Sequence, residues 1–263
     1  MRRSLLVGAL LVLVPDLAAC DRGPGPQPTA SPTVSPGASS GVMPLGATFD
    51  SLAPCREATD PRLPKGAGCA VAAEGDLDGD RRADSVISYA VVGPDGRAAR
   101  WLLRAVLAAG EVAEVEVDRP YQFAVLGTAD LDGDGRHEVF ARVEQGASTE
   151  FAGIFTLDDR GRLTRVAEDG KGPLQFAYSG SVTHGDGGSC TRLPDGRPGL
   201  VIRQVERLDE SQPYRWRETD YEWLGNGAVG VARTRQGAID AADGRDARLA
   251  PFFEFTCGGL RLP

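Results

Sequence analysis

The chain has little of the residue types on which several classes of function depend. Among its 263 residues there are two histidines and five cysteines, and only Lys65 and Lys171 of the 29 basic residues are lysines. The net charge of −8 offers no basic surface to nucleic acid, which binds proteins largely through its phosphates. The sequence also lacks a phosphate-binding glycine loop, a dinucleotide fingerprint and an H-E-x-x-H motif. These gaps argue against nucleic-acid binding and against the common nucleotide- and zinc-dependent enzymes.

Long hydrophobic runs are scarce as well. The run from Leu5 to Val14 has ten residues, whereas a helix that spans a bilayer needs about 20. It follows Arg2 and Arg3 and precedes small residues, which is the pattern of an export signal. The ending Leu17-Ala18-Ala19-Cys20 resembles the bacterial lipobox, whose cysteine receives the lipid. The resemblance implies a lipoprotein signal peptide over residues 1–19 and lipidation at Cys20; an ordinary secretory signal with a chance cysteine is the alternative.

Large apolar residues are almost missing from residues 20–46, which are rich in Pro, Ser, Thr and Gly. Such a segment cannot bury enough surface to fold, so we expect a lipid-anchored linker there. Residues 47–263 are then the folded domain. We expect the protein to be exported and anchored at the outer face of the bacterial cytoplasmic membrane or at the cell surface, with the lipid anchor as its only membrane contact.

Four cysteines remain after Cys20. An even number in an exported chain indicates two disulfides, for which four cysteines allow three pairings. We favour Cys55–Cys69, which are close in sequence, and this leaves Cys190–Cys257 to tie back the C-terminal part. A zinc site is the competing interpretation, but it needs closer paired spacing than this chain shows.

The most informative pattern is an acidic loop that occurs twice. "GDLDGDRRADSVISY" begins at Gly75, and "ADLDGDGRHEVFARV" begins 54 residues later. Acids occupy positions 1, 3, 5 and 9 of both loops: Asp76, Asp78, Asp80 and Asp84 in the first, and Asp130, Asp132, Asp134 and Glu138 in the second. Carboxylates this close repel one another, and calcium binds six to eight oxygen ligands in loops of this kind. We predict two Ca²⁺ sites, each completed by the backbone carbonyl at position 7, of Arg82 or Arg136.

The residues after each loop separate this pattern from an EF-hand. Position 12 is Ile87 or Ala141 rather than a bidentate acid, and a short β-prone run follows each loop. A D-x-D-x-D loop that enters a strand resembles the FG-GAP or VCBS-type repeats of integrin α-chains and bacterial surface proteins. The resemblance implies blades of a β-propeller with calcium bound at the loops. Arg81 departs from the usual glycine at position 6, and no clear FG…GAP segment precedes the loops.

A third, degenerate copy occurs in "CTRLPDGRPGLVIRQV". Its four ligand positions fall on Thr191, Leu193, Asp195 and Gly199. Asp195 is the only acid among them, so we expect this copy to form a turn without metal. Repeat starts near 76, 130 and 191 suit four-stranded blades.

These spacings predict an all-β fold, a β-propeller-like array of about three to four blades with Asp-rich calcium loops. The N-terminal part and the C-terminal "APFFEFTCG" either complete a fourth blade, or the repeats pack as a smaller all-β array. The segment from Arg97 to Ala109 fits a helix as well as a strand.

Catalytic sets are hard to assemble from these residues. A Ser-His-Asp set needs a histidine, and His137 lies inside the second acidic loop. His184, Asp186 and Ser189 occur together in a glycine-rich stretch that we expect to be a plain loop. Paired acids for glycoside hydrolysis stay open, because the spacing they need is spatial.

The aromatic residues of "YRWRETDYEWL" are the candidate ligand contacts, and these are Tyr214, Trp216, Tyr221 and Trp223. We therefore expect a calcium-stabilised surface lipoprotein that binds an extracellular protein or polysaccharide and is not an enzyme. The alternatives are a secreted hydrolase of cell-wall or external polymers and a purely structural envelope protein.

Overall fold

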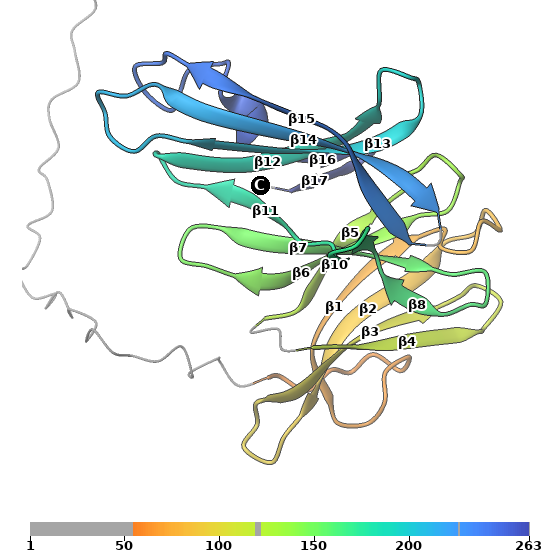
Figure 1. Ribbon diagram of the computed structural model, residues 1–263. Coiled ribbons are helices and arrows are strands. Elements are labelled where there is room, and N and C mark those ends of the chain that lie inside the picture. Colours follow the sequence, from red (N-terminus) through yellow and green to blue (C-terminus); the bar gives the residue numbers. More distant parts are fainter. Residues whose placement is uncertain (1–54, 119–121, 226, 263) are drawn as a thin grey trace, which may run out of the picture. The chain divides into compact units, whose positions relative to one another are not determined.

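The computed structural model describes residues 55–118, 122–225 and 227–262, which all belong to the second of the chain's two units, Thr48–Pro263 (Figure 1). The predicted signal peptide, Cys20 and the linker lie outside the described residues. The described part contains strands, one 3-10 helix (η1, Ala250–Phe252) and no α-helix, so the predicted all-β class is confirmed. No helix in these residues has the length and apolar character needed to cross a membrane.

The first sheet is an antiparallel meander in which each strand pairs with the next. Its strands are β1 (Ala67–Gly75), β2 (Asp84–Val92), β3 (Ala98–Val106) and β4 (Val112–Val117). The first acidic loop joins β1 to β2. The ambiguous segment from Arg97 to Ala109 forms strand β3, because burial of Trp101, Leu103 and Ala105 at a period of two outweighs its helix propensity.

A second meander repeats this arrangement, with the second acidic loop between its first two strands. Its strands are β5 (Ala124–Ala129), β6 (Glu138–Gln145), β7 (Glu150–Leu157) and β8 (Leu163–Arg165). Position 2 of each loop is a leucine whose side chain enters the core: Leu77 joins one apolar cluster and Leu131 another. Each loop is therefore fixed to the sheets beneath it.

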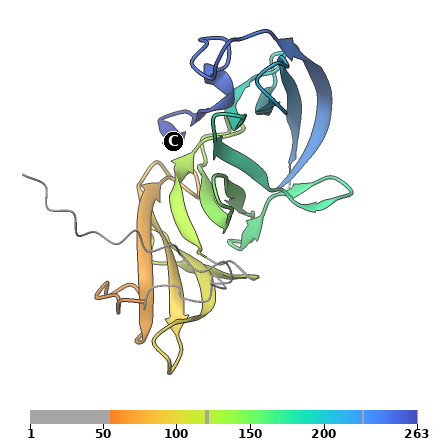
Figure 2. The same ribbon diagram turned by 90° about the vertical axis from the view of Figure 1, so that its left-hand side faces the viewer.

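The third meander is longer and continues the sheet of the second, because its first strand also pairs with β7. Its strands are β11 (Phe176–Gly180), β12 (His184–Arg192), β13 (Pro198–Glu206), β14 (Tyr214–Gly225) and β15 (Ala228–Ile239). Figure 2 shows the three meanders following one another, from orange and yellow through green to blue. The described residues contain no closed barrel or propeller, and the number of blades stays a prediction.

Four short strands complete the sheet. They are β9 (Ala167–Glu168), β10 (Gly172–Pro173), β16 (Phe255–Cys257) and β17 (Leu260–Leu262). The C-terminal segment does not form a further meander: β16 pairs in parallel with β12, and β17 pairs with β16. β9 pairs with β15 only at Ala228 and Val229, so residues 230–239 form an open sheet edge in the part of the chain that the structure describes.

The degenerate third copy does not form an acidic loop; its turn, between β12 and β13, has the hydrogen bonds of the β2–β3 hairpin turn. Leu193 N–H donates to the Arg197 carbonyl and Gly196 N–H donates to the Leu193 carbonyl, each at 2.8 Å. Gly93, Gly96 and Arg97 make the same two bonds between β2 and β3. The backbone of this turn therefore differs from that of the acidic loops, although the sequences can be aligned. Leu193, which the alignment places at a ligand position, is buried in the protein.

Two disulfides cross-link the described chain, Cys55–Cys69 and Cys190–Cys257. Both favoured pairings are thus present. The first ties the segment before β1 to β1 itself, and the second ties β12 to β16.

Candidate metal centres

Two groups of three acids come together at corresponding places in the first two meanders. One carboxylate oxygen from each of Asp76, Asp78 and Asp84 lies within 4.8 Å of the other two, and the same holds for Asp130, Asp132 and Glu138. These are positions 1, 3 and 9 of each loop. Each group could hold a metal ion, since three carboxylates supply hard oxygen ligands on one centre.

Backbone N–H groups hold the position 1 acid in the same way in both loops. Asp76 accepts from Gly79 and Arg81, each at 2.8 Å. Asp130 accepts from Gly133 at 2.7 Å and from Gly135 at 3.2 Å. The loop thus wraps around its first carboxylate in the same way in both copies.

Position 6 of the loop needs a left-handed backbone. Its φ is 91° at Gly135 and 67° at Arg81. Glycine adopts this conformation freely, whereas a residue with a Cβ loses roughly 1 kcal/mol. The first loop keeps the fold of the second despite its arginine, so the remaining contacts offset this cost.

The position 9 acid connects each loop to the strand that follows. Asp84 is 1% exposed and accepts from Leu77 N–H at 2.7 Å and from Ala108 N–H at 2.8 Å. Glu138 is 2% exposed and accepts from Leu131 N–H at 2.8 Å. A buried carboxylate with such partners is positioned before any ion arrives.

The second group pays an electrostatic cost without a cation. Burial raises the pKa of Glu138 to about 8, opposed by the Leu131 N–H and reinforced by the charges of Asp132 and Asp134. Burial also raises the pKa of Asp132, with Asp134 adding to the effect. A bound cation would favour the ionised form of both acids.

The position 5 acids lie outside the two three-acid groups. Asp80 forms an ion pair with Arg82 at 2.6 Å, and the hydrogen bonds from Arg82 lower the pKa of Asp80. Asp134 accepts from the Arg136 N–H at 2.7 Å, while the Arg136 guanidinium pairs with Asp159 at 3.1 Å. Ligation by these acids and by the carbonyls of Arg82 and Arg136 stays a prediction.

The two loops touch each other. The His137 N–H donates to the Asp76 carbonyl at 2.6 Å, and Thr128 Oγ1 donates to the Glu74 carbonyl at 2.7 Å. A Cβ on Gly75 would lie 2.3 Å from Thr128 Oγ1, so glycine permits this approach. His137 therefore has a structural place between the loops.

The stretch with His184, Asp186 and Ser189 is strand β12 and not the loop that the sequence suggested. Alternation places Ser189 on the opposite face from the other two. The His184 ring nitrogens contact Ser181 Oγ at 2.8 Å and Thr149 Oγ1 at 2.9 Å. Ser189 Oγ instead accepts from Arg203 at 3.0 Å. These three residues do not form a nucleophilic triad.

The four candidate aromatic contacts pack largely against the core. Tyr214 is fully buried, its hydroxyl donates to the Val182 carbonyl, and Arg207 covers its ring. The prediction that Tyr214 contacts a ligand is therefore wrong. Trp216 packs against Phe252 in the same cluster. Tyr221 and Trp223 pack against the cluster between the second and third meanders.

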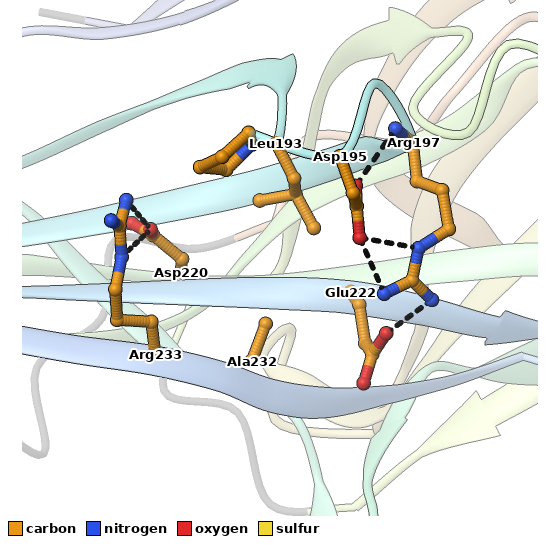
Figure 3. Close-up of a pocket in the computed structure, with 8 residues that line it drawn as sticks. Leu193, Asp195, Arg197, Asp220, Glu222, Ala232 and Arg233 are labelled. Atoms are coloured by element: carbon orange, nitrogen blue, oxygen red, sulfur yellow. Dashed lines mark hydrogen bonds and ion pairs between the residues drawn. The ribbon is translucent and has the colours of Figure 1, made fainter.

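An ionic cluster covers part of one face of β13–β15. Asp220 pairs with Arg233 at 2.7 Å and with Arg235 at 3.1 Å, and Arg235 also pairs with Glu218. Figure 3 shows Arg197 between Asp195 and Glu222 at the other end of this face. Every charged side chain drawn in that view has a partner, so stabilisation of the sheet accounts for the cluster without a ligand.

Polar residues on the other face of the same strands line a pocket of about 550 Å³. We call it the polar groove, and its side chains are those of His184, Asp186, Gln204, Glu206, Arg215, Arg217 and Gln236. Trp216, one of the predicted ligand contacts, is also among its lining residues, whereas the two arginines beside it were not predicted as contacts. A period-two reading of "YRWR" places Arg215 and Arg217 on the face opposite Tyr214 and Trp216.

No protein-family model, no curated protein and no solved structure matches this chain. The resemblance to FG-GAP repeats therefore rests on the two acidic loops.

Proposed function

We propose that residues 47–263 form a calcium-stabilised binding module of an exported, lipid-anchored surface protein, built from repeats of FG-GAP type. One observation carries this proposal: the two acidic loops make the same hydrogen bonds at the same place in two successive four-stranded meanders. On this proposal the meanders are blades, about three to four in number. The partner is an extracellular protein or polysaccharide.

Calcium suits these loops better than zinc or copper, because every side-chain donor is a hard carboxylate oxygen. Three acids, the position 7 carbonyl and water reach the six to eight ligands that calcium prefers. Extracellular modules bind calcium at roughly 0.1 to 1 mM, which suits a structural ion. The two disulfides favour an oxidising compartment outside the cytoplasm.

A thermal melt of the full chain with calcium and with a chelator tests the proposal. An ion at 100 times its Kd adds about 2.7 kcal/mol for one site, or about 5 to 10 °C in a domain of this size. We expect the melting temperature to rise with calcium and to saturate. Asp78→Asn combined with Asp132→Asn should abolish the rise.

A matched control separates the ion from ordinary turn chemistry. Asp78 and Asp132 each accept an N–H bond from two residues on, as do Asp95 and Asp195 in the hairpins. Asp95→Asn combined with Asp195→Asn removes the same charge but leaves both acid groups intact, so the calcium response should persist. Absence of any calcium effect in the wild type, with no binding by calorimetry, would overturn the proposal.

A further inference from the structure

The polar groove is built from four neighbouring strands in register. Across β12, β13, β14 and β15, Asp186 pairs with Gln204, Gln204 with Arg217, and Arg217 with Gln236. Strands lie about 4.8 Å apart, so this row of side chains spans about 14 Å. A second row, two residues along, consists of His184, Glu206 and Arg215. The groove therefore presents an ordered array of hydrogen-bonding groups and not a chance gap between loops.

Most of these groups have bonding capacity to spare. Among the described residues, the side chains of Glu206, Arg215, Arg217 and Gln236 make no hydrogen bond and no ion pair. Glu206 and Arg215 are direct cross-strand neighbours, yet they do not pair. This differs from the opposite face of the same strands, where Arg203, Arg233 and Arg235 all have acidic partners. The contrast points to a face kept open for a ligand.

Charge and polarity limit the class of ligand. Arg215 and Arg217 balance Asp186 and Glu206, so the groove has no net charge to select an ion. Its apolar lining residues are Val205 and Trp216, and both side chains pack on the other face, in the cluster around Tyr214. Protein partners are anchored chiefly by aromatic and other large side chains in buried pockets, which this groove does not offer.

We propose that the polar groove binds an uncharged saccharide, whose hydroxyl groups donate to the carboxylates and amides and accept from the guanidinium and amide groups. Each hydroxyl both donates and accepts, which matches the mixture of Asp, Glu, Gln and Arg side chains. This inference deepens the proposed function by naming the class of its ligand, and it rests on that function.

Affinity electrophoresis of the full chain, with both disulfides formed, tests the saccharide. The net charge of −8 drives the protein toward the anode, and native gels would contain dextran, a mannan, a galactan or a β-glucan. We expect at least one of these neutral polymers to retard the protein saturably. Arg217→Ala combined with Gln236→Ala should weaken the apparent affinity at least tenfold.

The control removes the same residue types from other strands. Arg100→Ala combined with Gln145→Ala takes an exposed arginine from β3 and an exposed glutamine from the end of β6. This control should be retarded like the wild type. No retardation by any neutral polymer, retardation only by anionic alginate or heparin, or undiminished binding by the groove variant would each overturn the inference. Release of reducing ends from the polymer during incubation would show that the protein cleaves its ligand, which would contradict a groove that only binds.

The calcium melt keeps this inference separate from the proposed function. A chain that responds to calcium but binds no neutral saccharide retains the calcium-stabilised module and loses the ligand. A chain that binds saccharide through Arg217 and Gln236 without any calcium response retains the groove and loses the metal centres.

Discussion

Asp220 shows at the scale of one residue how this chain stabilises buried charge. It is 2% exposed and accepts hydrogen bonds from Arg233 and Arg235. Burial opposes ionisation of Asp220, but the bonds from the two guanidinium groups outweigh it and lower the pKa. A lowered pKa in the folded state adds stability above the unfolded-state pKa of about 3.9, and this stability is lost as the pH falls through the folded-state pKa.

Asp220→Asn should therefore lower the free energy of unfolding by about 1 to 2 kcal/mol at pH 7. This is the lower part of the range of about 1.5 to 3 kcal/mol for hydrogen bonds to charged groups, because solvent screens the partly exposed Arg233 and Arg235. The difference from the wild type should shrink when the pH is lowered from 7 to about 3, because this range crosses the unfolded-state pKa of about 3.9 and approaches the lowered folded-state pKa. Urea denaturation at both pH values measures it. Asp195→Asn, which breaks an exposed pair with Arg197, should give no measurable change. A difference for Asp220→Asn that is independent of pH would contradict the assignment.

Single residues also mark the limit of prediction from sequence. The acids at positions 1, 3 and 9 converge as their spacing predicted, because tight loops turn alternate side chains toward one centre. The position 5 acids stay outside both groups: Arg82 binds Asp80 in the first loop, and the Arg136 N–H donates to Asp134 in the second. Spacing alone cannot decide between a metal ligand and a local ion pair.

At the scale of elements, β12 shows why some strands cannot be predicted from their own residues. Its glycines suggested a loop, but they let the C-terminal segment pack directly on the strand. A Cβ on Gly187 would lie 2.6 Å from the Glu254 carbonyl oxygen, and one on Gly185 would lie 2.7 Å from the Phe253 ring. The partner comes from more than 60 residues away in the chain, so the physical reason for the glycines cannot be seen in the stretch itself.

The disulfide between β12 and β16 should stabilise the domain more than the one near β1. The cysteines are 67 residues apart in the first case and 14 in the second. On the chain-entropy model, loss of Cys190–Cys257 costs about 4 kcal/mol and loss of Cys55–Cys69 about 3 kcal/mol. Urea denaturation of the two paired Cys→Ser variants compares them. The opposite order would show that strain or residual structure in the unfolded state outweighs chain entropy.

At the scale of the whole molecule, the all-β class could be read from short β-prone runs between turns, and two repeats from the acidic loops. The arrangement of the meanders could not. The second and third share one sheet because β11 pairs with β7, and this contact depends on edges brought together only in the folded chain. The polar groove was hidden for the same reason, since four strands in register build it.

The predicted lipid anchor concerns the whole molecule, and a labelling experiment tests it. Lipidation at Cys20 predicts incorporation of radiolabelled palmitate in a bacterial host and recovery with the membrane fraction. Cys20→Ala should lose the label and leave the membrane fraction, because the variant has no cysteine to carry the acyl chains that would anchor it. A wild-type protein without label, found in the medium, would favour the ordinary secretory signal instead.

The open edge of β15 bears on how the folded molecules behave at high concentration. Exposed strand edges carry free N–H and C=O groups and invite a second strand, which is the usual start of edge-to-edge aggregation. This edge strand carries Arg233 and Arg235, whose side chains are 46% and 42% exposed while they pair with Asp220 and Glu218. Two copies that joined along β15 would bring these cations together. The exposed arginines that pair with the acids of the sheet face thus also discourage the molecule from polymerising with itself.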